Sequence, residues 1–145
     1  MGRKIAAVVL GYLVMFVIVF VTFSATYLVM GADRSFKPGT YDVTTTWVLV
    51  SLVLSFLAAL AGGRVAVAIG RERKVAAMLA VVVVILGVIL AIPNLNAPKT
   101  DEVRTAGVSN AEAMWKARQP AAVMLITPVI GAIGILAGGR MRRRP

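Results

Sequence analysis

Four long apolar runs, separated by segments that contain the charged residues, constrain the fold of this chain more than any other feature. Each has about the length that an α-helix needs to cross a bilayer, roughly 18 or more apolar residues. A soluble domain of 145 residues would have no core large enough for a hydrophobic content of 59% and a mean hydropathy of +0.88. We therefore predict an all-α integral membrane protein with four transmembrane helices, at about residues 5–30, 47–69, 75–92 and 121–139.

Local residues predict where these helices begin and end. The threonines at 44–46 precede the second helix and can cap its first turn, while Trp47 suits the headgroup level of a membrane. Proline interrupts the backbone hydrogen bonds of a helix, so Pro93 is expected to end the third helix. Pro128 lies inside the fourth helix and is expected to kink it.

Basic residues predict the orientation, because cytoplasmic segments keep the excess of Lys and Arg. One side holds ten bases and the single acid Glu72, and the other holds six bases and five acids. Both termini and the middle loop are therefore predicted to face the cytoplasm, in a multi-pass protein of the cell membrane (inner or plasma membrane). The ten bases, which are expected to contact anionic lipid headgroups, are Arg3, Lys4, Arg64, Arg71, Arg73, Lys74, Arg140, Arg142, Arg143 and Arg144.

A repeated pattern divides the chain into two helical hairpins. Arg-Lys-Ile-Ala-Ala at 3–7 opens the first helix as Arg-Lys-Val-Ala-Ala at 73–77 opens the third. Ala-Gly-Gly-Arg ends the second helix at 61–64 and the fourth at 137–140. Two-helix units share one orientation, so a pseudo-two-fold axis along the membrane normal is expected. The predicted hairpins are residues 1–72 and 73–145, the second with an outer loop at 93–120 and a basic cytoplasmic tail at 140–145.

Small residues recur at matching positions of the second and fourth helices. Spacings of three and four residues put each set on one helix face. Such faces let helices approach closely in lipid, so we expect these two helices to meet at the centre. The predicted packing residues are Ser55, Ala58 and Gly62 on the second helix and Gly131, Gly134 and Gly138 on the fourth.

The outer loops at 31–46 and 93–120 carry the most informative polar sequence. In the first loop a Pro-Gly turn lies between Phe36 and Tyr41, which is consistent with a small binding hairpin or with a lid anchored on lipid. In the second, Ser-Asn-Ala-Glu at 109–112 matches a capping box and predicts a short helix. This helix either lies in the membrane interface or docks a partner. The predicted partner surface consists of Phe36, Tyr41, Met114 and Trp115.

The residue inventory argues against catalysis. Histidine and cysteine are absent, which removes the usual ligands of zinc and haem and every thiol nucleophile. All six acids lie in predicted loops, which disfavours proton-coupled transport. The bases that give the formal charge of +10 lie beside apolar runs, so no nucleic-acid partner is expected. We predict no catalytic residue, no metal site and no cofactor.

Three functions remain open from the sequence. The first is a non-catalytic structural or accessory membrane subunit that acts through its outer loops and helix faces on a protein partner. The second is a small transporter or channel built as a homo-oligomer, for which the repeated hairpin and the glycine-rich helices argue. The third is an intramembrane enzyme, which has the least support because no base accompanies the hydroxyls of the spans.

Overall fold

The structure is a computed structural model that describes residues 2–96, 103–104 and 109–141. The described chain is all-helical, with two isolated β-bridges in its loops. As predicted, four of the described helices are long and apolar enough to cross a membrane. They are α1 (Gly2–Met30), α3 (Thr45–Gly70), α4 (Lys74–Asn96) and α6 (Ala121–Arg140), and the two short helices are α2 (Ala32–Ser35) and α5 (Asn110–Lys116).

Side-chain caps fix the first turns of α3 and α5. Thr44 Oγ1 accepts a hydrogen bond from the N–H of Trp47 at 3.2 Å. Ser109 Oγ accepts one from the N–H of Glu112, also at 3.2 Å. Each hydroxyl supplies an acceptor that the first helical turn lacks. Both helices therefore begin where the threonine run and the capping box predict.

The end of α4 differs from the sequence expectation, because the helix passes through Pro93 and ends at Asn96. Proline has no N–H to donate to the carbonyl of Ile89, four residues earlier. The interruption falls in the last turns, where few helical hydrogen bonds remain to be lost. Asn94 also supplies a side-chain donor there, since its Nδ2 donates to the carbonyl of Leu90 at 3.0 Å.

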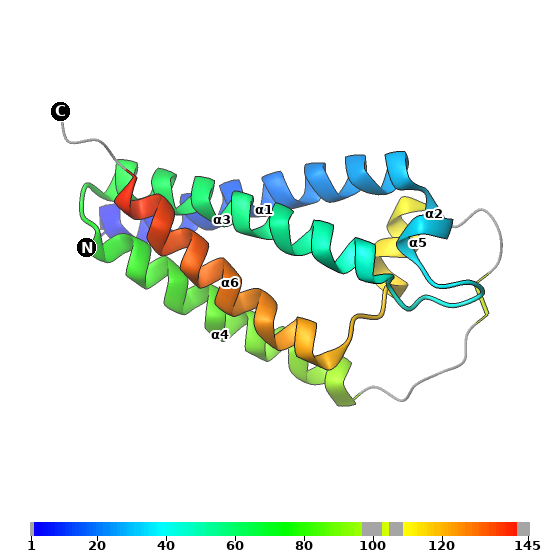
Figure 1. Cartoon of the computed structure of the whole chain (residues 1–145). Coiled ribbons are helices and arrows are strands. Elements are labelled where there is room, and N and C mark those ends of the chain that lie inside the picture. The colour runs from blue at the N-terminus through cyan, green and yellow to red at the C-terminus, as the bar shows by residue number, and fades with distance from the viewer. Residues whose placement is uncertain (1, 97–102, 105–108, 142–145) are drawn as a thin grey trace.

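The helices pack in the order α1, α3, α6 and α4, so that α3 and α6 occupy the centre (Figure 1). The first residue of α1 and the last residue of α6 lie at the same end of the bundle, which we call the basic end. The short helices α2 and α5 lie at the opposite end. The core is concentrated toward the basic end and consists of Ala7, Ala59, Ala66, Val67, Val75, Ala76, Leu79, Ala80 and Ile135.

Glycines bring the backbones of α3 and α6 into contact. A Cβ on Gly138 would overlap the carbonyl of Leu60, and a Cβ on Gly63 would overlap the carbonyl of Ile135. A Cβ on Gly134 would lie 2.8 Å from Cβ of Ala59, closer than side-chain carbons approach one another. Since these neighbours are mostly backbone atoms, only glycine permits this separation of the two helices.

Two other predicted packing residues, Gly62 and Gly131, face helices other than their predicted partner. Gly62 faces α1, where its Cβ would be 2.8 Å from the carbonyl oxygen of Gly11, and Gly131 faces Val83 on α4. Ala58 is fully buried and Ser55 is half-buried. Successive helical residues are turned by about 100°, so a difference of one position changes which neighbour a residue meets. The α3 residues that the glycine contacts with α6 involve are Phe56, Ala59, Leu60 and Gly63, whereas the predicted residue Gly62 faces α1.

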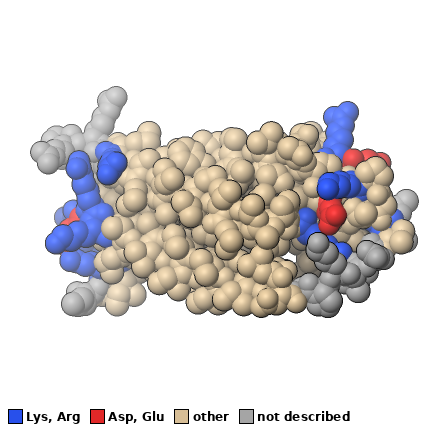
Figure 2. All heavy atoms as spheres, turned by 60° about the horizontal axis from the view of Figure 1, so that its bottom comes forward, with Lys and Arg blue, Asp and Glu red and all other residues tan. Residues whose placement is uncertain are grey.

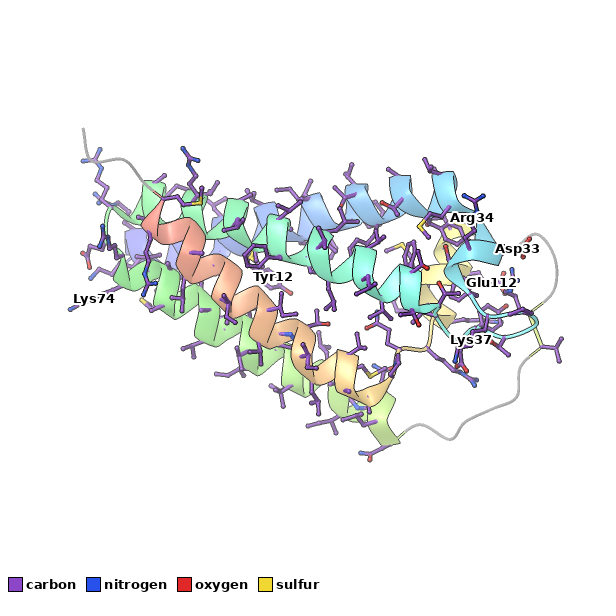
Figure 3. All side chains as sticks on the ribbon, in the orientation of Figure 1. Tyr12, Asp33, Arg34, Lys37, Lys74 and Glu112 are labelled. Carbon is purple, nitrogen blue, oxygen red and sulfur yellow. The ribbon has the colours of Figure 1, made fainter. Side chains whose placement is uncertain are left out.

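Charged side chains lie at the two ends of the bundle, and an uncharged band separates them (Figure 2). Figure 3 shows the same division: Lys74 lies at the basic end, Tyr12 within the band, and Asp33, Lys37 and Glu112 at the opposite end. This distribution fits four helices that cross an apolar layer.

Candidate functional site

Three segments fold together at the end opposite the basic end, and we call residues 31–44, 103–104 and 109–119 the α2–α5 module. In its first segment the N–H of Thr40 donates to the carbonyl of Lys37 at 3.2 Å, which closes a turn. Gly39 has a φ of 69° in this turn, a left-handed conformation that favours glycine at that position. Its third segment pairs with the first, because Val43 and Arg118 are joined by a backbone hydrogen bond of 3.0 Å.

Aromatic rings form the interior of the module. Phe36 lies edge-on to Tyr27 of α1 and to Tyr41, with ring centroids 6.3 and 6.0 Å apart. Trp47 of α3 lies edge-on to Tyr27 at 6.3 Å. Ala113 of α5 is buried in the same cluster. Edge-to-face packing of this kind adds to the apolar stabilisation, so the module is fixed on the ends of α1 and α3.

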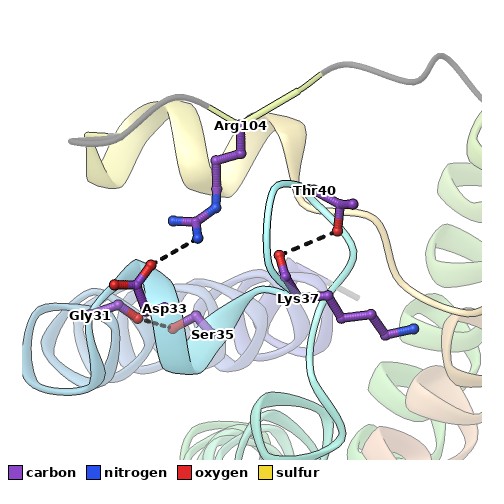
Figure 4. Close-up of polar contacts among 6 residues, drawn as sticks. All are labelled: Gly31, Asp33, Ser35, Lys37, Thr40 and Arg104. Atoms are coloured by element: carbon purple, nitrogen blue, oxygen red, sulfur yellow. Dashed lines mark hydrogen bonds and ion pairs between the residues drawn. The ribbon is translucent and has the colours of Figure 1, made fainter.

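Arg104 joins the second outer loop to the first (Figure 4). Its guanidinium forms an ion pair of 2.8 Å with Asp33 and lies 5.9 Å from the ring centroid of Phe36. Its backbone N–H donates to the carbonyl of Gly39 at 3.0 Å. The Arg104 side chain is only 8% exposed. Ion pair, ring contact and backbone bond together make Arg104 a structural residue of the module.

A second polar contact holds α5 against the first loop. The hydroxyl of Tyr41 donates to Glu112 at 2.9 Å, and Lys116 forms an ion pair with the same carboxylate at 3.3 Å. The Lys116 ammonium also lies 5.3 Å from the centre of the Tyr41 ring. The hydrogen bond from Tyr41, followed by that from Lys116, lowers the pKa of Glu112 below its ordinary value of 4.5.

Acid is expected to weaken this contact. Because the pKa of Glu112 is lowered by folding, its stabilisation is present above pH 4.5 and is lost as the pH falls through the lowered pKa. Hydrogen exchange of the α5 amides, measured from about pH 6 to about pH 3, should show lower protection at acid pH after correction for the intrinsic rate. Glu112→Gln should remove most of this pH dependence. Protection that does not fall in acid in the unmodified chain, or that falls by the same amount in Glu112→Gln, would contradict the assignment.

Two of the four predicted partner-surface residues reach the surface of the module. Trp115 is 90% exposed and Met114 is half-exposed, whereas Phe36 and Tyr41 are 2% and 4% exposed. The two buried rings belong to the interior because the first loop folds back over α1 and α3. Val103, next to Arg104, is 78% exposed. The exposed apolar surface of the module therefore comes from its second and third segments.

No protein-family model matches this sequence, and no curated protein or solved structure shows detectable similarity to it.

Three hydroxyl groups within the spans donate to carbonyls of their own helices. Thr22 donates to the carbonyl of Ile18 at 2.7 Å and Thr127 to that of Val123 at 2.7 Å. Ser51 donates to its own helix in the same way, at 2.8 Å. With their donors used inside the helix, these hydroxyls lend little to a polar path across the bundle.

The predicted headgroup residues that are described lie at the basic end. Arg3 donates to the carbonyl of Gly70 at 3.2 Å, and Lys4 forms an ion pair with Glu72 at 2.9 Å. These contacts join the start of α1 to the short connection between α3 and α4. The other predicted headgroup residues that the structure describes are all exposed, namely Arg64, Arg71, Arg73, Lys74 and Arg140. The predicted headgroup residues Arg142, Arg143 and Arg144 lie outside the described residues.

Sequence reasoning missed the role of Arg104 and the contact of α5 with α1. Asn110 Nδ2 donates to Ser24 Oγ at 3.0 Å across 86 residues of sequence. Nothing in the local sequence distinguishes Arg104 from the other loop bases, or Asn110 from a residue of a short helix on the surface. The single signal was the length of the second outer loop, which predicts that it contains structure.

Proposed function

We propose that this protein is a non-catalytic accessory subunit of the cell membrane, which binds a protein partner through the α2–α5 module. The observation that carries the proposal is the combination of a module fixed by three segments with an almost fully exposed tryptophan at its surface. Trp115 is 90% exposed beside Met114, on a helix held in place by hydrogen bonds to Tyr41 and Ser24 and by a buried alanine. Rigidly held tryptophans are typical centres of protein interfaces.

In the proposed topology, both termini face the cytoplasm and the module faces the outside. Support comes from the charges of the two ends. The described bases of the basic end accompany a single acid, Glu72, whereas the module mixes both signs. The positive excess stays in the cytoplasm during insertion. Anionic headgroups of the inner leaflet would then be the lipid partner of the basic end.

We further propose that α5 lies at the level of the outer headgroups. Its first residue, Asn110, bonds to Ser24, which follows Lys4 by twenty residues of α1. Twenty helical residues extend for about 30 Å, close to the thickness of the hydrocarbon core. Trp115 and Met114 are thus within reach both of the lipid interface and of a neighbouring membrane protein.

The proposed origin of the four spans is a duplicated hairpin. The packing supports it, because α1 packs on α3 as α4 packs on α6, and the two helices that contain Ala-Gly-Gly-Arg are the central pair, although α3 continues beyond the motif to Gly70. These two helices also run in the same direction, toward the basic end (Figure 1). A two-fold axis along the membrane normal would relate hairpins arranged in this way.

The accessory function is tested by crosslinking from position 115 in native membranes. A photoreactive phenylalanine analogue at position 115 is expected to give one discrete protein adduct that also co-purifies in stoichiometric amount with the unmodified chain. The same analogue at position 133, an exposed α6 residue within the uncharged band, serves as the matched control and should label lipid. Lipid adducts alone at position 115, with a clean homo-oligomer on purification, would contradict a partner-binding role and favour transport.

Replacement of Trp115 by alanine is expected to separate binding from folding. The side chain is exposed, so the free energy of unfolding should change by less than about 0.5 kcal/mol. Recovery of the co-purifying partner should fall at least about tenfold, as truncation of a central interface tryptophan typically causes. Partner recovery is measured by quantitative mass spectrometry, and Lys37→Ala, at another exposed position of the module, provides the control.

A further inference from the structure

A pocket of about 180 Å³ lies between α5 and the ends of α1 and α3. Aromatic residues line one side of it, namely Phe23, Tyr27, Phe36 and Trp47, and the opposite side is formed by α5 and the residues that follow it. None of the described residues that line the pocket is charged. Its polar groups include the side-chain amides of Asn110 and Gln119, so the pocket is neutral and mainly aromatic.

The size of the pocket corresponds to one small ring. A cavity of about 150 Å³ with apolar walls is large enough to hold benzene. The described walls thus suit an apolar group of about six to eight carbon atoms.

Asn110 supplies an unused hydrogen-bonding group beside this space. Its Nδ2 donates to Ser24, whereas its Oδ1 is buried and has no hydrogen-bond partner among the described residues. A buried amide oxygen without a donor is unfavourable. Turning the amide would exchange the two atoms and leave Nδ2 without a partner in place of Oδ1. In either orientation one buried polar atom of Asn110 is left without a partner, and a ligand hydroxyl, which is both donor and acceptor, could pair with it once the side chain turns toward the pocket.

We propose that this pocket binds an uncharged amphiphile that combines a ring-sized apolar body with a hydroxyl group. The aromatic walls would hold the body, and the Asn110 amide, after a small rotation toward the pocket, would pair with the hydroxyl. The absence of charge among the lining residues disfavours phosphate or carboxylate ligands. The proposal concerns a small-molecule site and is independent of whether a protein binds at Trp115.

Trp47 provides a direct reporter of binding. The chain has two tryptophans, so Trp115→Phe leaves Trp47, which lines the pocket, as the single fluorophore. The probe is 4-bromophenol, a ring with a hydroxyl whose bromine quenches indole fluorescence on contact. The full chain in lipid discs is expected to show a saturable quenching phase above the linear quenching caused by probe dissolved in the bilayer. Linear quenching alone, in lipid discs and after lipid removal, would overturn the proposal.

Filling the pocket tests its position. Ala113 is buried in the pocket wall and Ala111 is exposed on the same helix, so leucine at either site adds the same side chain in different places. Ala113→Leu should lower the affinity for 4-bromophenol at least about tenfold, the effect of blocking one small apolar site. Ala111→Leu should leave it unchanged. Equal affinities in the two variants would overturn the proposal.

The role of Asn110 is tested by a ratio that does not depend on the stability of the variant. Asn110→Ala should reduce the preference for 4-bromophenol over bromobenzene by about tenfold, since only the phenol has a hydroxyl to lose its partner. An unchanged preference would refute the proposed hydrogen bond and with it the amphiphile class. Saturable binding seen only after lipid removal would identify a membrane lipid with a hydroxyl as the natural occupant, whereas binding in both preparations would identify a free solute.

Discussion

Gly138→Ala is expected to destabilise the bundle by about 3 kcal/mol, at the upper end of what overpacking causes. The added Cβ would overlap the carbonyl of Leu60, a backbone group that α3 holds in its own hydrogen-bond ladder. Alanine is the better helix former by about 1 kcal/mol, so the expected loss is what remains after that gain. Thermal unfolding in mild detergent, followed by circular dichroism, measures the change.

Gly131 provides a matched control on the same helix. A Cβ there would lie 3.5 Å from Val83, an ordinary van der Waals distance. Gly131→Ala is therefore expected to leave the stability unchanged or to raise it by up to about 1 kcal/mol through helix propensity. Opposite signs for two glycines seven residues apart would identify the backbone contact as the cause. Equal effects of the two substitutions would show that α3 and α6 do not approach at Gly138.

Phe36→Ala should unfold the α2–α5 module and leave the four long helices in place. The Phe36 ring contacts Tyr27, Tyr41 and the Arg104 guanidinium, and its truncation should cost about 3–5 kcal/mol. Because the main core lies toward the basic end, this loss should remain local. Limited proteolysis should then cut residues 31–44 and 109–119, while the helical content changes only by the two short helices.

Trp115→Ala is the control for this second experiment, since it removes a larger ring from an exposed position. The module should resist protease both in that variant and in the unmodified chain. Protease resistance in Phe36→Ala as well would show that the aromatic interior does not hold the module together.

The four spans and the two capped helix starts were predictable because they depend on local sequence. An apolar run of sufficient length forms a helix in lipid, where backbone polar groups have no other partner. The hydroxyls of Thr44 and Ser109 cap the turns that follow them whatever the rest of the chain does. Pro93 misled the prediction because a proline near a helix end removes only one hydrogen bond.

The rotation of the helices was not predictable from the same information. A helix that is apolar on every side has no polar face to indicate which residues point inward. Ser55, Ala58 and Gly62 therefore looked equivalent to the residues one position further along, although the latter meet α6. The module was hidden for a different reason: its contacts, such as Arg104 with Asp33, join residues about 70 positions apart in otherwise ordinary loops.

The backbone contacts between α3 and α6 also provide a point about which the two helices can rotate, and this point lies close to the basic end. They involve Gly134 and Gly138 near the end of α6, whereas that helix begins at Ala121, seventeen residues before Gly138 and about 25 Å away. Over this distance, a rotation of α6 relative to α3 by about 5° at the glycine contacts moves the start of α6 by about 2 Å. Small adjustments between two glycine faces are thus amplified at the opposite membrane surface, beside the segment that leads from the α2–α5 module into α6.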